Sequence, residues 1–293
     1  MDGVLVVDKP QGLTSHDVVA AARRLLGERR IGHTGTLDPL ATGVLPLVVG
    51  QATRLARFLS AADKEYDATV RFGLTTDSHD ITGTETGRTD IVPSRDAVER
   101  AIQSLTGEYR QTPPAFSAKK VHGRRAYAAA REQDPVALTP VPVRVARADL
   151  LDVSGGRVRI ALTCSAGFYV RSFADALGTL TGAGACLEAL RRVRSGQFTL
   201  ATALSLGDLN DPARVAAGLV PLDRLLPDFP AVTLTDAGRA FAAHGRELGP
   251  GDYEPDVLHA AAWIRLLDAG GTLVGLAQGG STPGSLHPSL VLI

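Results

Sequence analysis

A stretch crowded with glycine and proline, followed directly by an apolar run, limits the fold of this chain more than any other feature. Residues 32–43 hold three glycines and a proline, which interrupt both helices and strands. The run Val44–Val49 contains no polar residue, the pattern of a strand buried on both faces. We therefore expect a loop over 32–43 that leads into a central strand.

Apolar periodicity predicts further elements before the C-terminal part of the chain. Alternation with period two indicates strands, whereas a capping Ser or Thr before an apolar stripe indicates a helix. The expected strands are Gly3–Asp8, Lys64–Leu74 and a hairpin of Val141–Val153 with Arg157–Cys164, and the expected helices begin after Thr14 or Ser15 and after Ser94 and cover 124–131 and Ser172–Leu180. Mixed strands and helices of this kind predict an α+β body.

The composition changes beyond Asp208, where acidic residues, prolines and short segments prevail. The spacing of Pro227 and Pro230 suits a linker. After this linker we expect strands near 231, Trp263–Leu267, Thr272–Ala277 and Leu290–Ile293 and a helix around Asp236–His244. The pattern predicts two domains, residues 1–226 and a small, mostly β module over 227–293.

The net charge of zero conceals an uneven distribution of charged residues. Residues 1–204 carry 26 basic against 21 acidic side chains, whereas 205–293 carry 5 against 10. Residues 110–131 hold six basic residues and no acidic one. Such a segment suits phosphate groups, because phosphate binding depends on local charge, although a solvated surface has the same composition.

Length, composition and cysteine spacing exclude several classes of protein. The 293 residues, 44% of them hydrophobic, can bury a core without disulfides or metals. No apolar run approaches the ~18 residues of a membrane span, and the N-terminus lacks a signal-peptide pattern. Cys164 and Cys186 lie outside zinc spacing, so we expect two buried thiols. We expect a cytoplasmic protein with no membrane partner.

Familiar cofactor motifs are also missing. The sequence has no GxxxxGK[ST], no HExxH, no GxSxG and no dinucleotide fingerprint followed by a ribose-binding acid. The glycines of 32–43 could cradle a phosphate, but that loop lacks the lysine of a nucleotide-binding loop. We therefore expect neither a metal nor a nucleotide cofactor.

Asp38 is the candidate reactive group of the loop, between two apolar neighbours. An Asp-Pro pair forms turns, and a turn alone would explain it. Alternatively, its carboxylate is ionised at neutral pH, since an ordinary Asp has a pKa of ~3.9. Arg171 is the natural partner, and Tyr169 shares its face if that segment is extended. By pattern alone, Tyr66, Tyr169 and Arg171 equally suit ordinary sheet positions.

Several separate motifs together resemble the bacterial tRNA pseudouridine-55 synthases, the TruB family. The matching segments, in the order of that family, are Gly3–Gly12, Gly32–Gly43, Lys64–Tyr66, Pro113–Lys120, Tyr169–Arg171 and Leu190–Arg192. The tail is similar to a small PUA-type RNA-binding module. The resemblance spans nearly the whole chain and implies a mixed-sheet catalytic domain followed by a PUA-like module.

The resemblance implies a role for each residue that matches a motif. Asp38 would be the catalytic aspartate, Arg171 its ion-pair partner and Tyr66 the aromatic ring that stacks on the target base. The residues implied in substrate binding are Tyr169 and Leu190 in the uridine pocket, His33 near the flipped nucleotide, Lys9 below the active-site loop, and Lys120 in the basic loop. Phosphates would contact 110–131 and 191–194.

The implied reaction breaks the bond between uracil N1 and ribose C1′, turns the base and rejoins it through C5. No group arrives or leaves, so no cofactor is required. Asp38 could attack C1′ as a glycosidase carboxylate does, or remove the ribose 2′ proton towards a glycal. The target uridine must first be everted from the tRNA, which costs a few kcal/mol. The implied partner is the T arm and elbow of tRNA, without a guide RNA or an obligatory protein.

Three other interpretations stay open at this point. Guide-RNA-dependent synthases share the aspartate loop, but this chain lacks the basic extensions expected of a ribonucleoprotein subunit. An RNA-folding protein could open the tRNA elbow without chemistry, and would have no need of Asp38. A nucleoside or glycoside hydrolase would require a second catalytic carboxylate or a metal.

Overall fold

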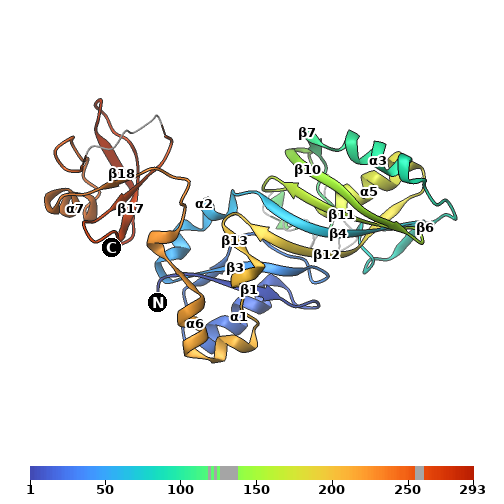
Figure 1. The fold of residues 1–293 in the computed structure, drawn as a ribbon, viewed down its shortest axis with the longest axis horizontal. Helices are drawn as coiled ribbons and strands as arrows, with labels where there is room; N and C mark the ends of the chain where they lie inside the picture. Colours follow the sequence, from blue (N-terminus) through green and yellow to red (C-terminus); the bar gives the residue numbers. More distant parts are fainter. Residues whose placement is uncertain (118–119, 122–123, 126–137, 255–260) are drawn as a thin grey trace.

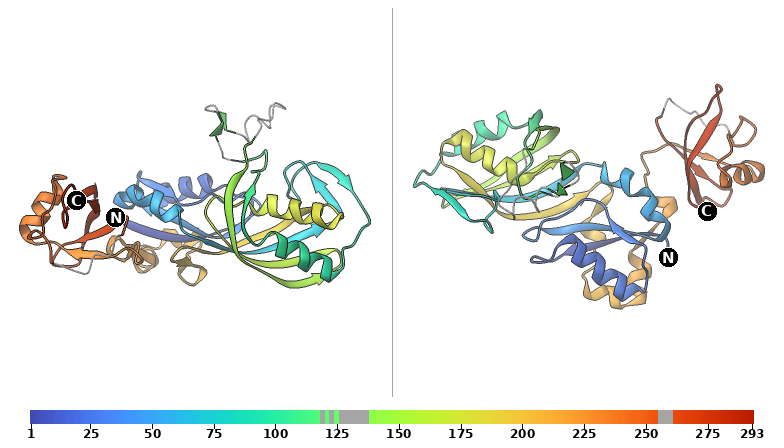
Figure 2. Two further views of the ribbon diagram at one scale, coloured as in Figure 1. Left: turned by 90° about the horizontal axis from the view of Figure 1, so that it is seen from above. Right: turned by 180° about the vertical axis from the view of Figure 1, so that it is seen from behind.

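The molecule is elongated and has a large α/β body with a smaller β module at one end of its long axis (Figure 1). A computed structural model describes residues 1–117, 120–121, 124–125, 138–254 and 261–293. The N-terminus lies in the body, and the C-terminus lies in the small module (Figures 1 and 2).

One mixed sheet forms the body. Among the described residues, its path runs through β14 (Leu219–Pro221), β1 (Gly3–Lys9), β3 (Thr42–Val49), β12 (Ala185–Ser195), β4 (Lys64–Phe72), β11 (Arg157–Cys164), β10 (Val141–Ser154) and β7 (Gly107–Gln111), with β2 (Ile31–His33) beside β3 and β13 (Phe198–Thr199) beside β12. β3 and β12 pair in parallel, and only over Thr42–Gly43 against Arg191–Arg192. This short contact joins the two halves of the sheet, and β4 pairs with β12 next to it.

Helices cover the sheet in two groups. The body contains α1 (Ser15–Leu26), α2 (Ala56–Ser60), α3 (Arg95–Ser104), α5 (Val170–Thr181) and α6 (Pro212–Gly218), with short 3-10 turns at Gly50–Leu55, Leu200–Thr202, Gly207–Asn210 and Leu222–Arg224. α3 and α5 pack together beside β10 and β12, and α1 and α6 lie near β1 and β2 (Figures 1 and 2). Thr14 and Asp17 form a capping box at the start of α1. Gly27 ends that helix in the left-handed conformation.

Two short hairpins stand apart from the main sheet. β5 (Leu74–Thr76) pairs with β6 (Glu85–Arg88), and β8 (Lys120–Val121) pairs with β9 (Arg124–Arg125). The predicted helix over 124–131 is therefore wrong at its first two residues, and the rest of it lies outside the described residues. Gly73 separates β4 from β5 at a φ of 83°, so the expected strand Lys64–Leu74 is two strands.

The prediction for the central strand is confirmed. β3 is buried from Gly43 to Val49, and both of its faces meet apolar neighbours. The α+β body, the capped helices and the hairpin of β10 and β11 are also as predicted. Cys164 and Cys186 are free and buried, as expected of core thiols.

Two expectations about the middle of the chain fail. α5 begins at Val170, two residues before the predicted start, so Tyr169 is the extended residue before the helix and Arg171 lies in its first turn. The segment is therefore not extended through Arg171, and Tyr169 and Arg171 do not share one face of a strand as expected. The strand β12 has no counterpart among the predicted elements, although it carries one side of the pocket described below.

The C-terminal module has its own sheet, ordered β15 (Ala231–Thr233), β16 (Ile264–Leu267), β17 (Leu273–Gly279) and β18 (Leu286–Val291), with α7 (Asp236–Ala243) against it. Aromatic contacts connect it to the body: the Phe58 ring centroid lies 4.8 Å from that of Trp263 and 6.0 Å from that of Phe229. In the part of the chain that the structure covers, no helix is both long and apolar enough to span a membrane.

Candidate active site

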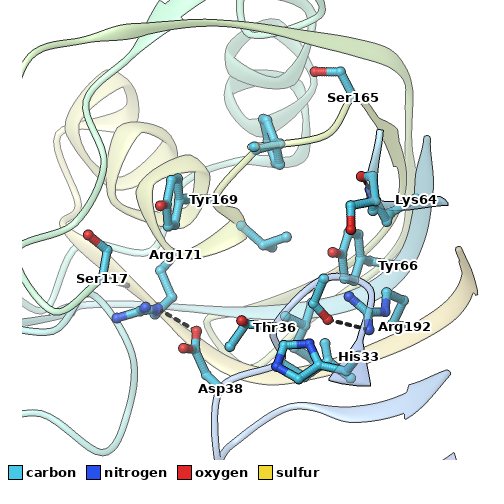
Figure 3. A pocket seen from close by; sticks show the side chains of 17 residues that line it. His33, Thr36, Asp38, Lys64, Tyr66, Ser117, Ser165, Tyr169, Arg171 and Arg192 are labelled. Atoms are coloured by element: carbon cyan, nitrogen blue, oxygen red, sulfur yellow. Dashed lines mark hydrogen bonds and ion pairs between the residues drawn. The ribbon is translucent and has the colours of Figure 1, made fainter. Parts of the chain in front are cut away.

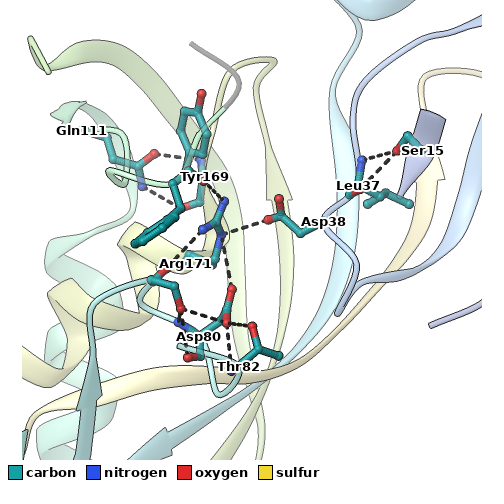
Figure 4. A network of polar contacts seen from close by, with 10 residues as sticks. Ser15, Leu37, Asp38, Asp80, Thr82, Gln111, Tyr169 and Arg171 are labelled. Carbon is teal, nitrogen blue, oxygen red and sulfur yellow. Dashed lines mark hydrogen bonds and ion pairs between the residues drawn. The ribbon is translucent and has the colours of Figure 1, made fainter. Parts of the chain in front are cut away.

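The loop before β3 is held at both residues that flank Asp38. The Ser15 hydroxyl, fully buried, accepts from the Leu37 backbone N–H at 2.8 Å and donates to its carbonyl at 3.1 Å (Figure 4). On the other side, the Gly12 N–H donates to the Pro39 carbonyl at 2.8 Å. The start of α1 therefore clamps the loop, and the Asp38 side chain projects from a fixed backbone.

Arg171 forms an ion pair with Asp38 at one side of the pocket. Its Nε lies 2.9 Å from Asp38 Oδ2, and its side chain is only 6% exposed. Its two other nitrogens donate to the carbonyls of Ser78 at 3.1 Å and Phe116 at 2.8 Å. The first turn of α5 and these two carbonyls fix the guanidinium, so it can orient the carboxylate of Asp38.

A second carboxylate lies behind the guanidinium. Asp80 is buried, and its Oδ2 is 3.8 Å from Arg171 Nε (Figure 4). The other oxygen accepts from the Ser78 hydroxyl at 3.0 Å and from the Thr82 N–H and hydroxyl at 3.0 and 2.6 Å. Arg171 is thus held between two acidic groups, of which only Asp38 lines the pocket.

The position of Asp38 determines how its activity should depend on pH. Desolvation raises the pKa of this carboxyl above its usual range, and the Arg171 guanidinium opposes the shift. If the ionised form is the reactive one, turnover is lost as the pH falls through this raised pKa. The acid limb of the pH–rate profile should therefore have its midpoint above ~3.9, the ordinary value for Asp.

Burial lowers the pKa of His33 to about 4, so the imidazole is a second pocket group that titrates at acidic pH. A His33→Asn variant should keep the acid limb of the wild type. A limb that disappears in this variant, or one with a midpoint at or below ~3.9 in the wild type, would contradict the assignment to Asp38. Single-turnover rates at a series of pH values give the midpoint of the acid limb, and circular dichroism at each pH confirms that the protein is folded.

A pocket of about 380 Å³ opens beside these groups, between the loop after β2, the strands β4 and β12, and the start of α5 (Figure 3). It is lined by His33, Gly35, Thr36, Leu37, Asp38, Ser60, Lys64, Tyr66, Ser117, Ser165, Gly167, Phe168, Tyr169, Val170, Arg171, Leu190 and Arg192. Gln111 holds the backbone of Tyr169, since its side chain accepts from the N–H at 2.8 Å and donates to the carbonyl at 3.0 Å. The volume and the aromatic lining suit one planar base.

Most of the residues singled out in the sequence meet in this pocket. Asp38, Arg171, Tyr66, Tyr169, Leu190 and His33 all line it. Lys9 does not: its buried ammonium donates to the carbonyls of Pro10 at 2.9 Å and Leu13 at 2.6 Å, next to the turn that clamps Pro39. Lys120 lies in β8, and nothing of its side chain is described.

The expectation that residues 191–194 contact phosphates is wrong at the buried Arg192, and it stays a prediction for Arg191 and Arg194, whose side chains are 41% and 32% exposed. Of residues 191–194, proposed to contact phosphates, Arg192 is buried and donates to backbone carbonyls. Arg191 pairs with Asp8 and Arg194 with Glu65, both at 2.7 Å. These two ion pairs connect β12 to β1 and β4.

Sequence reasoning missed several side chains that build the site. They are Ser15, Asp80 and Gln111, which position other residues, and Lys64 and Arg192, which line the pocket. Asp80 and Gln111 act on partners far along the chain, for example 58 residues between Gln111 and Tyr169, whereas Lys64 contacts carbonyls only two and four residues away. A signal was available for Lys64 and Arg192, because each lies in a motif that contains a predicted site residue, Tyr66 for Lys64 and Leu190 for Arg192.

Removing the Ser15 hydroxyl should loosen the Asp38 loop. In Ser15→Ala, the N–H and carbonyl of Leu37 lose their side-chain partner in a buried place, which costs about 1–3 kcal/mol of stability. The single-turnover rate should fall about tenfold or more, because small misplacements of a reacting group are costly. Chemical unfolding and rate measurements test this.

The matched control is Ser104→Ala, which removes a hydroxyl that donates to the Ala101 carbonyl in α3. This control should leave the rate unchanged. Equal rates for Ser15→Ala and the wild type would show that the loop does not need the clamp.

The described side chains form no metal-binding cluster. Among the residues whose positions are described, no group of three or more His, Cys, Asp or Glu side chains is placed to hold a metal ion.

Comparison with known proteins identifies the family. Residues 23–170, just over half of the chain, match the family described as TruB family pseudouridylate synthase (N terminal domain). The chain is 41% identical over 296 aligned positions to the tRNA pseudouridine synthase B of Solibacter usitatus, with all of both chains covered. It is 42% identical to the protein of the same name from Mycobacterium sp. (strain KMS), over 89% of this chain and 88% of the relative.

Solved structures show the same fold. A chain of the archaeal box H/ACA sRNP Nop10–Cbf5 complex matches 99% of this chain and 86% of its own length, with a TM-score of 0.75 and 25% identity. A chain of a Cbf5–Nop10–Gar1 complex matches with a TM-score of 0.76 and 26% identity, over 99% and 85%. From its motifs, its pocket and these matches together, the chain belongs to the TruB family of pseudouridylate synthases, enzymes that isomerise uridine to pseudouridine.

Proposed function

We propose that this enzyme converts the uridine at position 55, in the T loop of tRNA, into pseudouridine, with Asp38 as its catalytic carboxylate. The observation that carries the proposal is the ion pair of Asp38 with Arg171 at one side of a pocket lined by aromatic rings. The relatives named tRNA pseudouridine synthase B support tRNA as the substrate.

The pocket residues suit an everted base. Tyr66 stacks on the uracil ring, which returns ~1–3 kcal/mol of the energy needed to unstack it. Tyr169, Leu190 and Val170 enclose the base and keep water from intercepting it after the glycosidic bond breaks. His33 lies beside the everted nucleotide, and Lys9 supports the loop from below. Asp38 either bonds to C1′ or removes the 2′ proton, and Arg171 orients it in both routes.

The rest of the chain would hold the tRNA. In this proposal residues 1–226 form the catalytic domain, and 227–293 form a PUA-like RNA-binding module. Lys120 and its basic neighbours contact backbone phosphates of the T arm and elbow. No guide RNA is needed, since the substrate is recognised by its own shape. A tRNA substrate also places the enzyme in the cytoplasm.

Tritium release from uridine C5 tests the proposal. The transcript is an unmodified tRNA labelled at C5 of its uridines, and a second transcript carries cytidine in place of the T-loop uridine. We expect one label released per molecule of the first tRNA and none from the second. Release from both transcripts would refute the T-loop site, and release from neither despite binding would favour an RNA-folding role.

A further inference from the structure

Two buried cations line the pocket without an acidic partner. Lys64 is 6% exposed, and its ammonium donates to the carbonyls of Ser60 at 2.5 Å and Ala62 at 2.6 Å. Arg192 is 1% exposed and donates to the carbonyls of Val44 at 2.7 Å and Gly35 at 3.0 Å. Within the described ranges, no carboxylate forms an ion pair with either side chain. Neither cation therefore has an ion-pair partner among the described residues.

The two cations lie next to each other and to Tyr66. A Cβ atom added at Gly35 would lie 3.3 Å from Arg192 Nη1 and 3.7 Å from Lys64 Cε, so both side chains converge on this glycine. Arg192 is the register partner of Tyr66 across β12 and β4. Figure 3 shows Lys64, Tyr66 and Arg192 gathered on the side of the pocket away from Arg171.

Burying two unpaired cations is expensive, and apolar side chains of similar volume would stabilise the sheet at least as well. Burial lowers the pKa of Lys64 to about 8, which still leaves most of the ammonium charged at neutral pH. A guanidinium stays charged at any pH that the protein survives. The pocket thus has a permanently electropositive side, whereas the charge of Arg171 is balanced by Asp38 and Asp80.

The proposed reaction creates a negative charge in this pocket. When the bond between N1 and C1′ breaks, its electron pair leaves with uracil, and the charge spreads over N1, O2 and O4. The pair then forms the bond from C5 to C1′, while Asp38 regains its electron pair or returns the 2′ proton. The C5 proton leaves to solvent, and N1 takes up a proton from solvent, so the product is neutral. The detached uracil is an anion between these two steps.

We propose that Lys64 and Arg192 stabilise the negative charge that develops on the uracil as it leaves, and so act as electrostatic catalysts of bond cleavage. The inference rests on the proposed function, because it concerns the same pocket. Fixed charges aimed at a site of developing charge need no rearrangement during the reaction, which makes this arrangement effective. A role in binding a phosphate would instead change tRNA affinity.

The test varies the acidity of the leaving base. Single-turnover rates are measured for the wild type and Lys64→Met on two tRNA transcripts, one with uridine and one with 5-fluorouridine at the target. Nuclease digestion and chromatography follow the loss of the target nucleoside, because 5-fluorouridine has no C5 proton to lose after the base rejoins. Fluorine makes the departing uracil anion less basic, so the negative charge on it needs less stabilisation. We expect Lys64→Met to lose about 10²-fold with uridine and at most about one tenth of that loss with 5-fluorouridine.

The control is Leu190→Ala, which enlarges the pocket without changing its charge and should slow both substrates by the same factor. Equal losses for Lys64→Met on the two substrates, or a loss that lies only in the Kd for tRNA, would overturn the inference. Thermal unfolding shows whether Lys64→Met is folded. If Lys64→Met does not fold, Lys64→Gln takes its place, because glutamine keeps donors for the carbonyls of Ser60 and Ala62. A wild type that converts neither transcript would refute the proposed function instead.

Discussion

The Asp38→Asn variant should convert no measurable uridine while it still binds tRNA. Asparagine retains an oxygen that can accept from Arg171 Nε, so the loop held by Ser15 keeps its position. Its amide has neither the negative charge to attack C1′ nor the basicity to remove the 2′ proton. The single-turnover rate should fall by at least about 10⁴-fold, in the range seen when a central catalytic group is removed.

Rapid-quench tritium release gives this rate, and filter binding gives the Kd for tRNA, which should stay within a few-fold of the wild type. Asp63→Asn is the matched control, because this carboxylate pairs with Arg144 at the surface. It should lose no activity. Turnover by Asp38→Asn at a substantial fraction of the wild-type rate would remove Asp38 from the mechanism.

The Arg171→Lys variant should also be severely impaired, although it keeps the charge. A lysine ammonium is a point charge and cannot contact Asp38, the Ser78 carbonyl and the Phe116 carbonyl in the directions that the planar guanidinium does. The buried carbonyls lose donors, and Asp38 loses its fixed orientation. We expect the single-turnover rate to fall about 10²–10³-fold, with tRNA affinity little changed.

Arg159→Lys provides the comparison, because Arg159 also pairs with an aspartate, Asp67, through its Nε, but at the surface. Exposed pairs contribute little to stability, so this change should alter neither rate nor folding. If Arg171→Lys matched Arg159→Lys in rate, the geometry of the guanidinium would be irrelevant to the reaction.

Local rules predicted most elements of the fold. One local pattern was enough to predict each of two strands, the apolar run Val44–Val49 and the alternating segment from Lys64 to Phe72. Both are strands in the structure. Ser94 caps α3 as expected. By contrast, β12 carries three arginines, of which Arg191 and Arg194 pair with distant acidic residues, so its sequence does not have the apolar period of a buried strand.

The site was predictable only where a motif or a resemblance named a residue. Asp38 and Arg171 were paired from the sequence, and the structure places them 2.9 Å apart. Asp80 and Gln111 carry no local signal, because each acts through a partner that the fold brings from more than 50 residues away. The start of α5 was misjudged because the segment before Val170 has no side chain that caps the helix.

The most direct test of the account is to map pseudouridine in a tRNA at single-nucleotide resolution after treatment with the enzyme. Carbodiimide modification followed by primer extension locates the product, and Asp38→Asn serves as the paired reaction. The account predicts one pseudouridine, at position 55, with the wild type and none with the variant. Pseudouridine at another position, or at position 55 in the Asp38→Asn reaction, would contradict it.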